Sequence, residues 1–222
     1  GRWREILDAP PVADPDLYRV TAAIQHYAAG VAHAALGDVA AAEAAQTAFQ
    51  AARDRVPERR KLHNNDCLDL LAVADAMLEG EIAYRRGDHD AAFTHLRRGV
   101  ALDDGLRYDE PWGWMQPVRH ALGALLLEQG RIEEAETAYR EDLGLAGSLP
   151  RACVHPDNVW SLTGLMACLR ARGAAETPEE TPEARLLGQR LAVAAARADG
   201  PIPVSCFCAG AGASDQSGVA ST

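Results

Sequence analysis

The chain has 222 residues and a formal net charge of -10, with 48% hydrophobic, 24% charged and only 5% aromatic residues. These fractions are typical of a globular protein with a sizeable core and exclude an intrinsically disordered chain. An acidic chain without a basic stripe is a poor candidate for binding nucleic acid or an anionic membrane surface. No apolar run reaches the roughly 18 residues that a membrane-spanning helix needs. We therefore expect neither nucleic acid nor a membrane among its partners.

Apolar residues recur at helical spacing along most of the chain and predict an all-α protein. We expect helices near residues 2–8, 15–36, 38–55, 66–86, 88–102, 115–129, 131–144, 158–172 and 182–198. Asp66 and Asp88 are candidate N-caps, and Pro182 suits the first turn of the last helix. After residue 200 the composition changes, and residues 201–222 are expected to form an extended tail that contains Cys206-Phe207-Cys208.

Pairs of glycines seven residues apart indicate an internal repeat. They are Gly30 and Gly37, Gly80 and Gly87, and Gly123 and Gly130, while a fourth copy keeps Gly173 but has Met166 at the earlier position. The first glycine of each pair predicts a close approach of two helices, and the second predicts a left-handed turn at a helix C-terminus. The alanine five residues after each turn glycine (Ala42, Ala92, Ala135) is expected to be small because the second helix crosses the first there.

This arrangement of small residues resembles the tetratricopeptide repeat (TPR). The resemblance implies a right-handed α-solenoid of helix-turn-helix pairs, with repeats at about 15–55, 66–104, 115–144 and 158–198 of a domain spanning 1–200. The turn glycines are 50, 43 and 43 residues apart, whereas the ideal repeat has about 34 residues, so long inter-repeat loops are expected. The alternative is an ordinary alanine-rich helical bundle.

The first residues also fit the repeat, because Gly1-Arg2-Trp3-Arg4-Glu5-Ile6 aligns with the turn that begins at Gly130. Residues 1–8 would then be the orphan second helix of a truncated repeat. Together with Tyr108-Asp109-Glu110-Pro111 and Trp160-Ser161-Leu162, this segment is similar to the C-terminal part of a group of long, largely uncharacterised bacterial and fungal TPR proteins. The resemblance implies that an upstream repeat region of the same protein is a partner. Cys168 lies in an apolar run, which favours a buried thiol and a reducing, cytoplasmic compartment.

Long loops between repeats are the natural place for a binding site. The best candidate runs from Tyr108 to Pro117, because tryptophan, tyrosine and arginine are enriched in binding hot spots. The candidate binding residues are Tyr108, Asp109, Glu110, Trp112, Trp114, Arg119 and His120, with Asn64 and Asn158 from other loops expected to converge on the same concave face. In the alternative interpretation, the two tryptophans cover a gap between repeats, Arg119 pairs with Asp109 or Glu110, and Asn64 belongs to a helix cap.

Chemistry other than peptide binding has weaker support in the sequence. His63, His120, His155, Asp109 and Glu110 are suitable metal ligands but lack a ligand spacing, whereas Cys206 and Cys208 suit copper or zinc. No nucleophile elbow and no phosphate-binding glycine motif occurs. We therefore expect no cofactor and a protein- or peptide-binding scaffold rather than an enzyme. The alternative is a metal-binding protein, or part of a metal-dependent enzyme, that uses the loop residues or the Cys-x-Cys.

Overall fold

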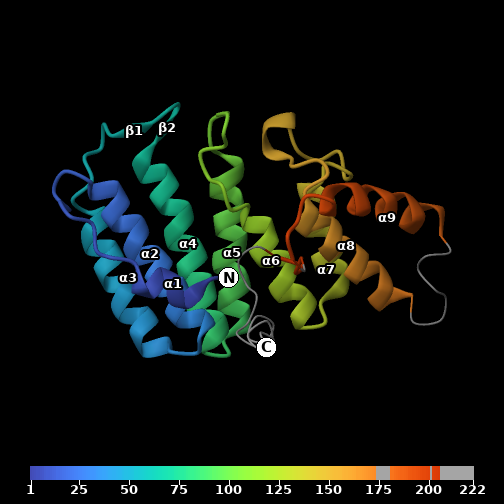
Figure 1. The fold of residues 1–222 in the computed structure, drawn as a ribbon, viewed down its shortest axis with the longest axis horizontal. Coiled ribbons are helices and arrows are strands. Elements are labelled where there is room, and N and C mark those ends of the chain that lie inside the picture. Colours follow the sequence, from blue (N-terminus) through green and yellow to red (C-terminus); the bar gives the residue numbers. More distant parts are fainter. Residues whose placement is uncertain (174–180, 201, 206–222) are drawn as a thin grey trace, which may run out of the picture. The chain divides into compact units, whose positions relative to one another are not determined.

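A computed structural model describes residues 1–173, 181–200 and 202–205, which are mostly helical (Figure 1). The chain forms two compact units, Gly1–Val118 and Arg119–Ala209. Unit 1 contains α1 (Trp3–Asp8), α2 (Arg19–Ala35), α3 (Val39–Arg53), β1 (Lys61–Leu62), β2 (Asn65–Asp66), α4 (Cys67–Arg85) and α5 (His89–Asp104). Unit 2 contains α6 (Val118–Glu128, apart from its first residue), α7 (Ile132–Asp142), the short 3-10 helix Arg151–Cys153, α8 (Val159–Arg172) and α9 (Pro182–Ala195).

The helices of each unit pack on one another. In unit 1, α2 packs on α1, α3 and α4, and α4 packs on α5. In unit 2, α8 packs on both α7 and α9. The strands β1 and β2 pair in antiparallel register, with Lys61 opposite Asp66 and Leu62 opposite Asn65. The all-α prediction is thus confirmed for the described residues, apart from this two-stranded hairpin, which was not predicted.

The helices lie where their periodicity predicts them, and the differences have local causes. The second helix begins at Arg19 rather than near residue 15, because the Asp14 carboxylate accepts hydrogen bonds from the backbone N–H groups of Asp16 and Leu17 and closes a turn there. Asp88 caps α5 by accepting from the Ala91 N–H, as predicted. Asp66 occupies the N-cap position of α4, as predicted, but its side chain makes no capping hydrogen bond; its carboxylate pairs with Lys61.

The turn glycines have the predicted left-handed conformation. Gly37, Gly87 and Gly130 have φ values of 87°, 84° and 70°, which L side chains rarely adopt. The fourth copy departs from the pattern, since Gly173 has a φ of -85°.

The first glycines of the pairs lie where helices touch. A Cβ atom at Gly30 would come within 2.8 Å of the Leu78 side chain, and one at Gly80 within 2.7 Å of Leu96. The alanines Ala42, Ala92 and Ala135 are fully buried. The predicted close approach of helices at Gly30 and Gly80 is therefore confirmed.

No described helix has the length and apolar character needed to cross a membrane.

Two cysteine side chains lie in the helical core. Cys67 and Cys168 are 2% and 0% exposed, which confirms the buried thiol predicted for Cys168. Burial raises the pKa of Cys67, and it raises the pKa of Cys168 to about 12.

We expect both buried thiols to resist alkylation in the folded protein. A thiol with the pKa of Cys168 is ionised to only roughly one part in 10⁴ at pH 8, and the thiolate is the reactive form. Iodoacetamide labelling followed by peptide mapping should therefore modify Cys168 at least about 100-fold more slowly in buffer than in urea. Equal rates in the two solvents would contradict the described burial.

Candidate functional site

The loop between α5 and α6 is fixed to the hairpin by hydrogen bonds from two asparagines. The Asn65 side chain is 2% exposed; its Nδ2 donates to the Arg107 carbonyl (2.9 Å) and to Asp109 Oδ2 (2.7 Å), and its Oδ1 accepts from the Arg107 N–H (2.7 Å). The Asn64 N–H donates to the Asp109 carboxylate (3.2 Å), and its Nδ2 donates to the Tyr108 carbonyl (2.8 Å). Asp109 is itself buried. Asn64, Tyr108 and Asp109 therefore converge, as the sequence suggested, and their polar groups hold the loop.

Local backbone geometry explains why the hairpin can reach the loop. His63 and Asn64 form the turn between β1 and β2, where His63 has a φ of 51°, and Asn65 follows in β2. The loop approaches so closely that a Cβ atom at Gly113 would come within 2.8 Å of Asn65 Nδ2 and 3.2 Å of Leu70 Cδ2. Only a residue without a side chain fits there.

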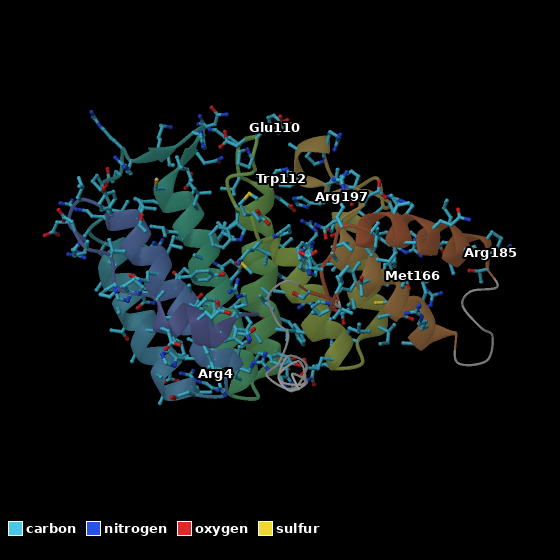
Figure 2. All side chains as sticks on the ribbon, viewed as in Figure 1. Arg4, Glu110, Trp112, Met166, Arg185 and Arg197 are labelled. Carbon is cyan, nitrogen blue, oxygen red and sulfur yellow. The ribbon has the colours of Figure 1, made fainter. Side chains whose placement is uncertain are left out.

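The loop displays some of its apolar side chains and buries others. Tyr108, Trp112 and Met115 are 55%, 42% and 60% exposed, and the Tyr108 hydroxyl donates to the Glu110 carboxylate. Figure 2 labels Glu110 and Trp112 on this loop. Trp114 is 8% exposed, and its ring meets the Tyr27 ring edge-on at a centroid distance of 5.6 Å. We call the exposed group Tyr108, Trp112 and Met115 the aromatic loop surface.

The remaining predicted binding residues belong to unit 2. Arg119 is 5% exposed, and its Nε donates to Glu141 Oε2 at 3.2 Å. Asn158 caps α8, where its side-chain oxygen accepts from the Trp160 and Ser161 N–H groups. His120 is fully buried. These three side chains are thus engaged inside unit 2, and the aromatic loop surface is made by unit 1.

A second polar group of residues surrounds the Asp142 carboxylate at the end of α7. His155 Nδ1 lies 2.8 Å from Asp142 Oδ1, while His120 Nε2 and Ser161 Oγ lie 3.1 Å and 2.6 Å from Oδ2. The Asp142 carbonyl also accepts from the His155 N–H at 2.6 Å. All four residues are at most 9% exposed. We call them the Asp142 cluster; it joins α6, α7, α8 and the loop before α8.

The Asp142 cluster has the chemistry of a buried ionised carboxylate held by donors. Burial by itself would raise the pKa of Asp142, but the hydrogen bonds and charges of His120 and His155 together lower it well below its ordinary value. Ser161 donates to the same carboxylate rather than to a histidine. A serine nucleophile needs a base to take its proton, so this arrangement does not activate Ser161 and instead fixes the elements that it joins.

The structure bears on a metal site in the described residues but not on one at Cys206 and Cys208. Within residues 1–173, 181–200 and 202–205, no group of three or more His, Cys, Asp or Glu side chains is placed to hold a metal ion. Cys206 and Cys208 lie outside the described residues, so their proposed role as copper or zinc ligands stays a prediction.

Sequence reasoning named His120 and His155 but missed Asp142 and Ser161. A signal for Asp142 was present, since it follows Ala135 and Tyr139 by seven and three residues on the buried face of α7. A carboxylate at a core-facing helical position needs buried donors.

No protein-family model, no curated protein and no solved structure matches this chain.

Proposed function

We propose that this chain is a protein- or peptide-binding scaffold of TPR-like helix pairs stacked as a right-handed α-solenoid, and that it captures its partner through the aromatic loop surface. The observation that carries the proposal is the exposure of Tyr108, Trp112 and Met115 on a loop that buried hydrogen bonds hold in place. The repeat part of the proposal is supported by the left-handed turn glycines and by the packing of α2 on both α3 and α4.

A fixed loop that exposes large side chains is well suited to recognition. Ordering of loops and side chains on association makes the free energy of binding less favourable. The Asn65–Asp109 hydrogen bond orders this loop before any partner binds. Tyrosine and tryptophan then offer a large contact area together with a polar group. Glu110 beside Tyr108 and the net charge of -10 favour a partner segment that carries basic residues next to its apolar ones.

The test is selection of peptides from a random phage-displayed library against the full chain, followed by affinity measurements with a Tyr108→Ala/Trp112→Ala variant. We expect the selected peptides to be apolar and basic, and the double substitution to weaken their binding about 30-fold or more, as for truncation of hot-spot residues. Isothermal titration calorimetry gives the affinities, and circular dichroism checks that the variant is folded.

The matched control is Leu186→Ala/Val193→Ala, which removes two exposed apolar side chains from α9, where they are 57% and 77% exposed. It should bind the selected peptides like the unmodified chain. If both double variants bind them with the same affinity, the aromatic loop surface is not the binding site.

A further inference from the structure

The segment after α9 folds back onto its own unit without regular secondary structure. Ser205 is only 2% exposed, and the Val204 carbonyl accepts a hydrogen bond from the Tyr139 hydroxyl at 2.9 Å. Ile202 and Val204 are half-buried, whereas Pro203 is exposed. Figure 1 shows this segment in red, running from the end of α9 back towards α6 and α7. Residues 202–205 therefore lie on the helices as a short peptide would.

The helices hold the donor for this segment rigidly. The Tyr139 ring is fully buried between Gly123 of α6 and Gly164 of α8, and a Cβ atom at either position would overlap the Tyr139 Cζ atom. Two glycines thus make room for one ring, whose hydroxyl reaches the Val204 carbonyl. The position of the hydroxyl is set by the core and does not depend on the segment that it binds.

The segment has the chemistry of an exchangeable ligand. Residues 202–205 carry no charge, and Pro203 favours an extended backbone and has no N–H to leave unsatisfied. A segment of four residues gives only a weak contact on its own, even with its hydrogen bond from Tyr139. The short connection to α9 keeps the segment bound despite this weak contact, because a tethered segment acts at an effective concentration on the order of millimolar.

We propose that α6, α7 and α8 form a peptide-docking surface centred on Tyr139, that residues 202–205 are its built-in occupant, and that the surface binds an uncharged, proline-containing peptide when this segment is displaced. The surface belongs to unit 2, so the proposal does not depend on the aromatic loop surface of unit 1.

The probe is a fluorescein-labelled synthetic peptide with the sequence of residues 199–205 (Asp-Gly-Pro-Ile-Pro-Val-Ser), and binding to the full chain is measured by fluorescence anisotropy. Ser205→Arg displaces the tethered segment, because an arginine side chain does not fit a position that is 2% exposed. We expect this variant to bind the peptide at least about 10-fold more tightly than the unmodified chain, in which the tethered segment competes. Val193→Arg, which adds the same residue at an exposed site of α9, should bind like the unmodified chain.

A third variant tests the role of Tyr139. Tyr139→Phe keeps the buried ring and removes the hydroxyl, so in the Ser205→Arg background it should weaken peptide binding roughly 3- to 10-fold, as for the loss of one hydrogen bond. Ile202→Asp displaces the segment by a different change and should reproduce the effect of Ser205→Arg. If the unmodified chain and both displaced variants bind the peptide equally, or if Tyr139→Phe has no effect, the docking proposal is wrong.

Discussion

Replacing Asp142 by alanine is expected to lower the free energy of unfolding by about 3–5 kcal/mol, because several buried donors lose their acceptor at once. The substitution leaves the donors of His120, His155 and Ser161 buried without their acceptor. Urea denaturation followed by circular dichroism measures the change. Glu133→Ala, which removes an exposed carboxylate from the same helix, is the matched control and should change stability by less than about 1 kcal/mol.

An isosteric substitution separates charge from packing at Asp142. Asp142→Asn keeps the shape but replaces one acceptor oxygen with an NH₂ group that faces buried donors. We expect a loss comparable to that of Asp142→Ala, since an unfavourable donor–donor contact replaces a hydrogen bond. If Asp142→Asn is as stable as the unmodified chain, the carboxylate is not the centre of the cluster.

The same carboxylate should make stability depend on pH in the acidic range. Because the folded pKa of Asp142 lies below its unfolded value of about 3.9, its stabilisation is fully present above about pH 5 and decreases as the pH falls towards the folded pKa. The difference in unfolding free energy between the unmodified chain and Asp142→Asn should therefore be largest between pH 5 and 7 and should narrow by pH 3. Urea titrations at these pH values measure the difference, and a gap that stays constant would contradict the lowered pKa.

The helices and their turns could be predicted from the sequence because they depend on short-range rules. Helical periodicity and glycine in a left-handed turn are both visible within a few residues, as at Gly87 and Asp88. The hairpin that contains Asn64 and Asn65 escaped prediction because each strand has only two residues and its stability comes from contacts with a loop more than 40 residues away.

The candidate sites were harder to predict because burial depends on tertiary contacts. Trp112 and Trp114 are two residues apart and looked equivalent in the sequence, yet one is exposed and the other packs against Tyr27 of α2. His120 and His155 looked like possible metal ligands, but the structure turns both towards Asp142. Composition and spacing identify residue types that can bind or react. The fold decides whether each of these side chains is exposed to solvent or buried in the core.

The repeat pattern also failed to predict which residue of α8 makes the closest helix contact. The fourth copy of the repeat has Met166 at the expected position, but the small residue against the neighbouring helix is Gly164, two residues earlier. The Tyr139 ring fills the space that this glycine leaves, and Gly123 makes room for the same ring on α6. One aromatic side chain thus depends on two glycines from different helices.

Replacing Gly164 by alanine is therefore expected to destabilise the protein by about 3 kcal/mol or more, at the upper end of the range for overpacked cores. The new Cβ atom would overlap Tyr139 Cζ, and the ring has no space to move away because Gly123 contacts it as well. Thermal and urea denaturation measure the loss. Gly188→Ala is the matched control, since a Cβ atom there meets no atom within 4 Å, and it should stabilise α9 by up to about 1 kcal/mol.

A second substitution shows whether the Tyr139 ring is the cause of this loss. In a Tyr139→Leu background, whose smaller side chain leaves room for the new methyl group, Gly164→Ala should cost at least about 2 kcal/mol less than in the unmodified chain. An equal loss of stability in both backgrounds would place the strain elsewhere in α8.

Because the Tyr139 hydroxyl also donates to the Val204 carbonyl, any shift of the ring by the new methyl group should also loosen residues 202–205. Faster hydrogen exchange at Ser205 in Gly164→Ala than in Gly188→Ala would show that the packing of one ring and the docking of this segment are coupled.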